Sequence, residues 1–141
     1  VATQPAEEAY DDVLADVGLE SVAAERAGRF SLGMRQRLAL ASALLGDPRV
    51  LLLDEPSNGL DPDGIRWLRN RLRSFADADG TVFVSSHLIA ELARLADDLV
   101  VVGAGRLIAA QTVDAITSRT GRSLEDSLLE MTMASAEFAS A

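Results

Sequence analysis

The sequence has no cysteine and no lysine, and both absences limit its chemistry. Without cysteine, the chain can form neither disulfide bonds nor thiolate metal sites. All 13 basic residues are arginine, so no motif that requires a lysine can be complete within these 141 residues.

Long apolar runs and an excess of positive charge are also missing. No apolar segment approaches the ~18 residues that a membrane-spanning helix needs. The small, polar and acidic residues 1–8 do not fit a secretory signal. The formal net charge of −9 disfavours nonspecific binding to nucleic acid and attraction to anionic lipid. We therefore expect a globular, cytoplasmic protein without a nucleic-acid partner, long enough for one hydrophobic core.

Apolar residues follow two periodicities that alternate along the chain. Helical spacing is expected over residues 7–17, 32–45, 62–75 and 88–95, and again after a capping box at residues 123–126. Strands are expected over residues 50–53 and 81–84, and an antiparallel hairpin over residues 99–102 and 107–110. This alternation predicts an α/β fold with a mainly parallel sheet and flanking helices.

The strand at residues 50–53 carries the most information. It reads VLLL without a polar break, which is typical of a strand buried on both faces. Asp54 and Glu55 follow it, at the end of a strand where ligands of open α/β sheets bind, and Pro56 stops the strand. The next strand ends close to His87, so neighbouring strands would bring these three polar side chains to one crevice. Adjacent carboxylates beside an apolar strand need a positive or protic partner, and a metal-bound nucleotide is the expected one.

Four segments in a fixed order resemble the motifs of ATP-binding cassette (ABC) ATPases. Residues 30–37 (FSLGMRQR) resemble the signature motif, residues 50–55 (VLLLDE) the Walker B strand, residues 58–61 (NGLD) the D-loop, and His87 the switch histidine. The likeness spans about residues 11–132, and the agreement in order and spacing makes it specific. The variant signature and the ending at residues 123–130 (SLEDSLLE) resemble the branch of bacterial drug and bacitracin exporters, the ABC-2-like branch.

The resemblance implies catalytic roles for three residues. Asp54 corresponds to the carboxylate that holds Mg²⁺ through water, and Glu55 to the one that polarises the attacking water. His87 corresponds to the residue that senses the γ-phosphate. These roles suit phosphoryl transfer, which depends on positioning, charge neutralisation and a proton acceptor. The alternatives are that the carboxylates only form a turn or a helix cap after the strand, and that the single histidine is structural or incidental.

The resemblance also implies that Ser31, Gly33 and Asp61 contact nucleotide or link two active sites across a dimer. A helix start offers unpaired N–H groups and a positive dipole end to a phosphate. The alternative for both Ser31 and Asp61 is a helix N-cap, which is compatible with a site at the same helix end. The family has glycine and glutamine where this chain has Leu32 and Met34, so contacts of that glutamine cannot be transferred.

The phosphate-binding loop of the family is missing, because it requires a lysine. The segment at residues 59–64 (GLDPDG) has the right glycine spacing, but it continues with Ile65 and its Pro62 lacks a backbone donor. We therefore expect a partial P-loop NTPase (ABC ATPase) fold that lacks its N-terminal portion. Residues 1–133 would form the C-terminal part of the nucleotide-binding domain, and residues 134–141 a frayed tail.

These features predict the ATP-binding and ATP-hydrolysing subunit of an ABC-type membrane exporter. It would use ATP and Mg²⁺, pair head to tail with a second ATPase subunit, and lie at the inner face of the membrane through membrane-spanning transporter subunits. The isolated chain is expected to be inactive, with marginal stability because sheet edges are uncovered. Two alternatives remain open: a truncated, non-catalytic remnant that only binds partners, and a fragment of an ABC-type DNA-maintenance ATPase.

Overall fold

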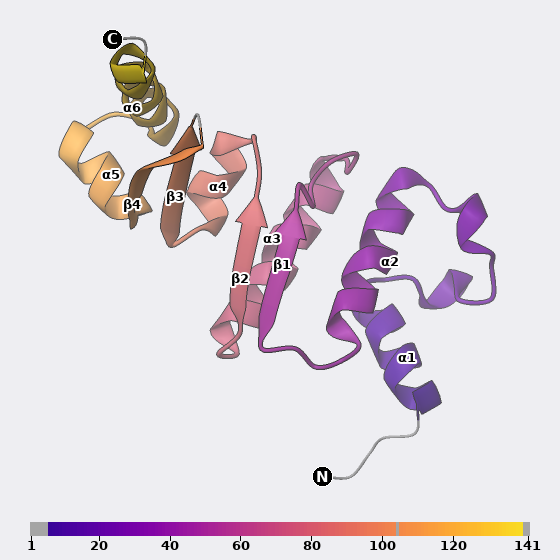
Figure 1. Cartoon of the computed structure of the whole chain (residues 1–141). Coiled ribbons are helices and arrows are strands. Elements are labelled where there is room, and N and C mark those ends of the chain that lie inside the picture. Colours follow the sequence, from indigo (N-terminus) through magenta and orange to yellow (C-terminus); the bar gives the residue numbers. More distant parts are fainter. Residues whose placement is uncertain (1–5, 104, 140–141) are drawn as a thin grey trace. The chain divides into compact units, whose positions relative to one another are not determined.

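The computed structural model describes residues 6–103 and 105–139 (Figure 1). The chain falls into two compact units, Val1–Ser86 and His87–Ala141. The sequence pattern predicts one domain over residues 1–133, and that boundary stays a prediction.

Two helices of the first unit, α2 (Leu32–Leu44) and α3 (Pro62–Asp77), start at polar caps. Ser31 Oγ accepts a hydrogen bond from the Met34 N–H (3.1 Å), and Asp61 Oδ1 accepts one from the Gly64 N–H (2.7 Å). Pro62 occupies the first position after the second cap, where its missing N–H has no consequence. The elements are α1 (Ala6–Asp16), the 3-10 helices η1 (Glu20–Val22) and η2 (Ala27–Arg29), α2 (Leu32–Leu44) and α3 (Pro62–Asp77).

Two strands of the first unit pair in parallel, as the sequence predicts. They are β1 (Val50–Asp54) and β2 (Thr81–Ser85), in a register that places Asp54 opposite Ser85. Parallel strands need a long crossover connection, which α3 supplies. Figure 1 shows α3 lying along one side of the two strands. The carboxyl ends of both strands therefore meet at one edge of the sheet.

The prediction that β1 is buried on both faces is wrong for the part of the chain that the structure describes. Leu51 is 2% exposed, whereas the next residue, Leu52, is 76% exposed. Val50 and Phe83 are also exposed. Successive strand residues point to opposite faces, and among the described residues only one face of this sheet is covered.

Helices α1, α2 and α3 share a core in the first unit. Arg37 of α2 connects them, because its Nη1 donates to Val17 O (3.0 Å) while its guanidinium lies 4.1 Å from the ring centre of Trp67. The buried members of this core are Val17, Leu19, Phe30 and Ala41, and Val13, Leu14, Met34 and Leu38 pack against them. The start of α2 is thus held firmly by its neighbours.

The second unit is built around an antiparallel hairpin, which confirms the predicted pairing. Its core joins the hairpin to the last two helices through Leu99, Ile116, Leu124 and Leu128. Its elements are α4 (Ile89–Leu95), β3 (Asp98–Gly103), β4 (Arg106–Thr112), α5 (Val113–Thr120) and α6 (Leu124–Ala139). Helix α6 includes residues 134–139, which the sequence pattern assigns to a frayed tail, and residues 140–141 lie outside the described part.

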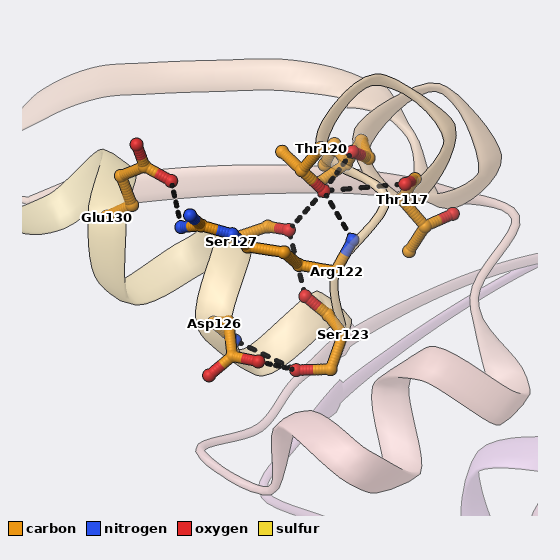
Figure 2. Close-up of polar contacts among 8 residues, drawn as sticks. Thr117, Thr120, Arg122, Ser123, Asp126, Ser127 and Glu130 are labelled. Carbon is orange, nitrogen blue, oxygen red and sulfur yellow. Dashed lines mark hydrogen bonds and ion pairs between the residues drawn. The ribbon is translucent and has the colours of Figure 1, made fainter.

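A polar network centred on the buried Ser127 joins α5 to α6 (Figure 2). Ser127 is 1% exposed; its hydroxyl lies 2.8 Å from Thr120 Oγ1 and donates to Ser123 O (2.8 Å). The Asp126 N–H donates to Ser123 Oγ (3.1 Å), which confirms the predicted cap. These bonds satisfy the polar groups where α5 ends and α6 begins.

Candidate functional site

Asp54 and Glu55 stand at the carboxyl end of β1, where Ser85 of β2 meets both of them. The Ser85 hydroxyl donates to Asp54 Oδ1 and accepts a hydrogen bond from the Glu55 N–H (3.1 Å). The same N–H also points to Ser85 O, at 3.1 Å. One side chain from the neighbouring strand therefore orients the first carboxylate and anchors the backbone of the second.

Glu55 adopts a backbone conformation that is unusual for a side-chain-bearing residue. Its φ of +46° lies in the left-handed region, and residues held in sparsely populated conformations cost about 1–3 kcal/mol. The hydrogen bonds that the Glu55 N–H donates to Ser85, and a bond from the Asn58 N–H to Glu55 O (3.1 Å), hold it there. The chain thus turns sharply directly after β1, next to the exposed carboxylate of Asp54.

Ser31 and Gly33 lie at the start of α2. Ser31 is exposed and caps the helix, as the N-cap alternative requires. Gly33 is half-buried, and a Cβ added to it would lie 3.5 Å from Cδ2 of Leu60. The helix start therefore sits against residues 58–61, the turn that resembles the D-loop, and the first unit brings Ser31 and Gly33 close to this turn.

Asp61 ends this turn and caps α3 through its 2.7 Å bond to the Gly64 N–H. The cap is therefore a demonstrated role of this carboxylate. A second role between two active sites stays a prediction, and the exposure of Asp61 is compatible with it.

His87 is the first residue of the second unit, and it is exposed. In the sequence it follows Ser85 by two residues. Its approach to Asp54 and Glu55 remains a prediction, because those two residues belong to the first unit.

The donor set suits Mg²⁺ only if a nucleotide shares the coordination. Among the described residues, no group of three or more histidine, cysteine, aspartate or glutamate side chains is placed to hold a metal ion. Mg²⁺ commonly binds through one or two carboxylates together with phosphate oxygens and water. Asp54 provides one such carboxylate, and its exposure leaves room for the remaining ligands.

A pocket of about 240 Å³ lies beside β1 in the first unit, but its lining does not suit a triphosphate. It is mostly apolar and includes Leu40, Leu52, Leu68 and Trp67, with Asp54 at one side. Ligand pockets usually measure roughly 300–1,000 Å³. Residues of α2, β1 and α3 line this hollow, while the polar edge of the sheet holds the candidate site.

Ser85 is the site residue that the sequence analysis missed. It belongs to the segment SSH at residues 85–87, in which the motif pattern assigns a role only to His87. The signal that finds it is strand pairing, because the parallel register places Ser85, the last residue of β2, beside Asp54, the last residue of β1.

The class of protein follows from the fold and from a family match. Residues 11–93 match the family model described as "AAA domain, putative AbiEii toxin, Type IV TA system". This match spans β1, the turn after it and β2. Together with the α/β fold, it defines a P-loop NTPase domain.

The chain belongs to the ABC ATPases within this class. It is 41% identical over 127 residues to the bacitracin transport ATP-binding protein BcrA of Bacillus licheniformis, covering 89% of this chain and 42% of that protein. It is 47% identical over 107 residues to the uncharacterized ABC transporter ATP-binding protein YhcH of Bacillus subtilis (strain 168), covering 75% of this chain and 35% of that protein.

A solved structure of the ATP binding subunit of an ABC transporter matches with a TM-score of 0.77 and 31% identity. The match covers 90% of this chain and 54% of that one. The predicted family and fold class are thereby confirmed. The chain spans 35–42% of the length of these two curated relatives.

Proposed function

We propose that this chain supplies the Mg²⁺- and water-handling residues of an ATP-hydrolysing site in an ABC exporter subunit. The arrangement of Asp54, Glu55 and Ser85 at the edge of β1 and β2 carries this proposal. Asp54 would hold the ion, and Glu55 would polarise the attacking water. His87 would sense the γ-phosphate. Bound Mg²⁺ would supply charge neutralisation on the phosphates.

The start of α2 serves a different nucleotide in this proposal. Ser31 and Gly33 would face ATP held by a second ATPase subunit in a head-to-tail dimer, and Asp61 would link the two sites. Support comes from the exposed, capped helix end, since such ends bind anions through their free N–H groups and dipole.

Membrane-spanning transporter subunits are the expected partners. Relatives named for bacitracin transport support an exporter that acts at the inner face of the membrane. Among residues 6–103 and 105–139, no helix is both long enough and apolar enough to span a bilayer. The net charge of −9 argues against nucleic acid as a partner.

Because it has no lysine, this chain would contribute only part of the ATP-hydrolysing site. The 141-residue chain has no side chain that can play the part of the phosphate-loop lysine. Titration of the purified chain with Mg-ATP in a calorimeter is therefore expected to show no binding at micromolar concentrations, and phosphate release should stay at background. Micromolar affinity would contradict this division of the site.

Turnover by the protein in a form that includes a phosphate-binding loop tests the activity itself. Glu55→Gln should leave ATP binding nearly intact and reduce hydrolysis by at least about 10²-fold, as expected for loss of a general base. Undiminished hydrolysis would remove Glu55 from this role. Stimulation by DNA, and not by membrane subunits, would favour the DNA-maintenance alternative.

A further inference from the structure

The turn at residues 58–61 is attached to α2 by contacts that the proposed function does not use. Gln36 Nε2 donates a hydrogen bond to Asn58 O (3.2 Å), across 22 positions of sequence. The side chain of Leu32 lies over Gly59, so a Cβ added to Gly59 would come within 2.6 Å of Leu32 Cγ and closer still to Cδ2. Two side chains near the start of α2 thus hold Asn58 and Gly59, which are successive residues of the loop at residues 58–61.

The other bonds of this turn are local. The Asn58 N–H donates to Glu55 O and the Leu60 N–H donates to Ser57 O, each at 3.1 Å. Such bonds shape a turn but do not fix its position against a neighbouring helix. Gly59 is exposed and has a φ of +75°, a conformation that glycine adopts without strain. The contacts from Leu32 and Gln36, together with Leu60 beside Gly33, therefore place the turn against α2.

Leu32 gives this chain a contact that the family's signature glycine cannot make. A glycine has no side chain to extend over the turn, whereas Leu32 reaches Gly59 and is still 51% exposed. A large apolar side chain at an exposed helix start gains stability only from what it covers. Here it covers the backbone of Gly59.

We propose that Leu32 and Gln36 are positioning residues that fix the turn at residues 58–61 on the start of α2. Ser31, Gly33 and Asp61 then form one fixed surface, because the turn is held by α2 at its beginning and joined to α3 at its end. This inference rests on the proposed function in one respect, namely that the surface faces the nucleotide of a second subunit.

A double-mutant cycle in the 141-residue chain tests the Leu32 contact. Gly59→Ala carries two penalties, the strained φ and the overlap with Leu32. Leu32→Ala removes the overlapping Cγ and Cδ atoms, so in that background Gly59→Ala retains only the strain. The urea midpoint should fall clearly less on Gly59→Ala when residue 32 is alanine. An equal fall in both backgrounds would overturn the contact.

Amide hydrogen exchange tests the Gln36 contact, and it also serves if Gly59→Ala does not fold. Gln36→Glu keeps the shape but removes the donor, whereas Gln36→Lys keeps a donor of similar reach. Losing one hydrogen bond should speed exchange of the Asn58 and Leu60 amides roughly fivefold. Gln36→Lys should restore slow exchange. Unchanged exchange in Gln36→Glu would overturn the proposal.

Turnover separates this inference from the proposed function. In a form of the protein that includes a phosphate-binding loop, Gln36→Glu should lower kcat several-fold with little change in ATP affinity, and Gln36→Lys should recover it. Full activity in Gln36→Glu would overturn the positioning role. The exchange and urea experiments contain no nucleotide, so failure of the ATPase proposal would leave their outcome unaffected.

Discussion

The hydroxyl of Ser85 contacts both acidic residues of the candidate site. It donates to the carboxylate of Asp54 and accepts from the backbone of Glu55. The second bond helps to hold Glu55 at a φ of +46°, together with the backbone bonds to Ser85 O and from the Asn58 N–H. Ser85 therefore orients the carboxylate of Asp54 and anchors the backbone of Glu55, although it transfers no proton and holds no metal in the proposed reaction.

Replacing this hydroxyl tests its importance. Ser85→Ala should lower the free energy of unfolding by about 1 kcal/mol, the usual contribution of a hydrogen bond. Ser85→Thr keeps the hydroxyl and suits a strand, so its stability should stay close to that of the parent. Urea unfolding of the 141-residue chain measures both. Equal losses in the two variants would show that the hydroxyl is not responsible.

At the scale of elements, two helix starts coincide with candidate site residues. Ser31 caps α2 and Asp61 caps α3. A cap fixes the helix start in space, and the same start offers N–H groups and a positive dipole end to an anion. For Asp61, the capping oxygen and the negative charge are separate properties, so substitutions can separate the two roles.

Asp61→Asn keeps a good N-cap without the charge, whereas Asp61→Ala removes both. Asp61→Ala should cost about 1 kcal/mol of stability, and Asp61→Asn only a few tenths. Both variants should reduce turnover of the dimer that contains the phosphate-binding loop if the charge links two sites. Thermal unfolding and phosphate release measure the two effects. Full turnover in Asp61→Asn would leave capping as the only role of this residue.

Most elements were predictable because their signals are local. The caps at Ser31 and Asp61, the apolar run of β1 and the turn between β3 and β4 each specify a boundary. Helix α5 was missed because its valine, isoleucine and threonine residues favour strands over helices. Its caps were present in the sequence, since Thr112 Oγ1 accepts from the Ala115 N–H (3.0 Å) and Gly121 has a φ of +61°.

The candidate site was predictable to a lesser degree. Asp54 and Glu55 could be predicted as site residues, because adjacent carboxylates beside an apolar strand need a positive or protic partner. Ser85 depends on strand pairing, which no local pattern records, and the turn held by Leu32 and Gln36 depends on packing between segments far apart in the sequence. Such contacts emerge only from the folded chain.

At the scale of the whole chain, each unit presents an apolar strand face to solvent. Leu52 and Phe83 are 76% and 56% exposed in the first unit, and Val102 and Leu107 are 63% and 65% exposed in the second. Contiguous apolar patches and short uncovered sheets promote association. The expectation of marginal stability follows from the same feature, and a cooperative melt at high temperature would contradict it.

Adjacent leucines on opposite faces of β1 provide a matched test of this uncovered face. Leu51→Ala should cost about 2–5 kcal/mol, because Leu51 is 2% exposed and its truncation leaves a cavity. Leu52→Thr combined with Phe83→Thr removes exposed apolar area but keeps strand-favouring side chains, so the urea midpoint should change little. Sedimentation velocity should show less self-association in this double variant than in the parent chain. If Leu52→Thr with Phe83→Thr destabilises the chain as much as Leu51→Ala does, the face of β1 that carries Leu52 is not exposed. If self-association is unchanged, this face is not the associating surface.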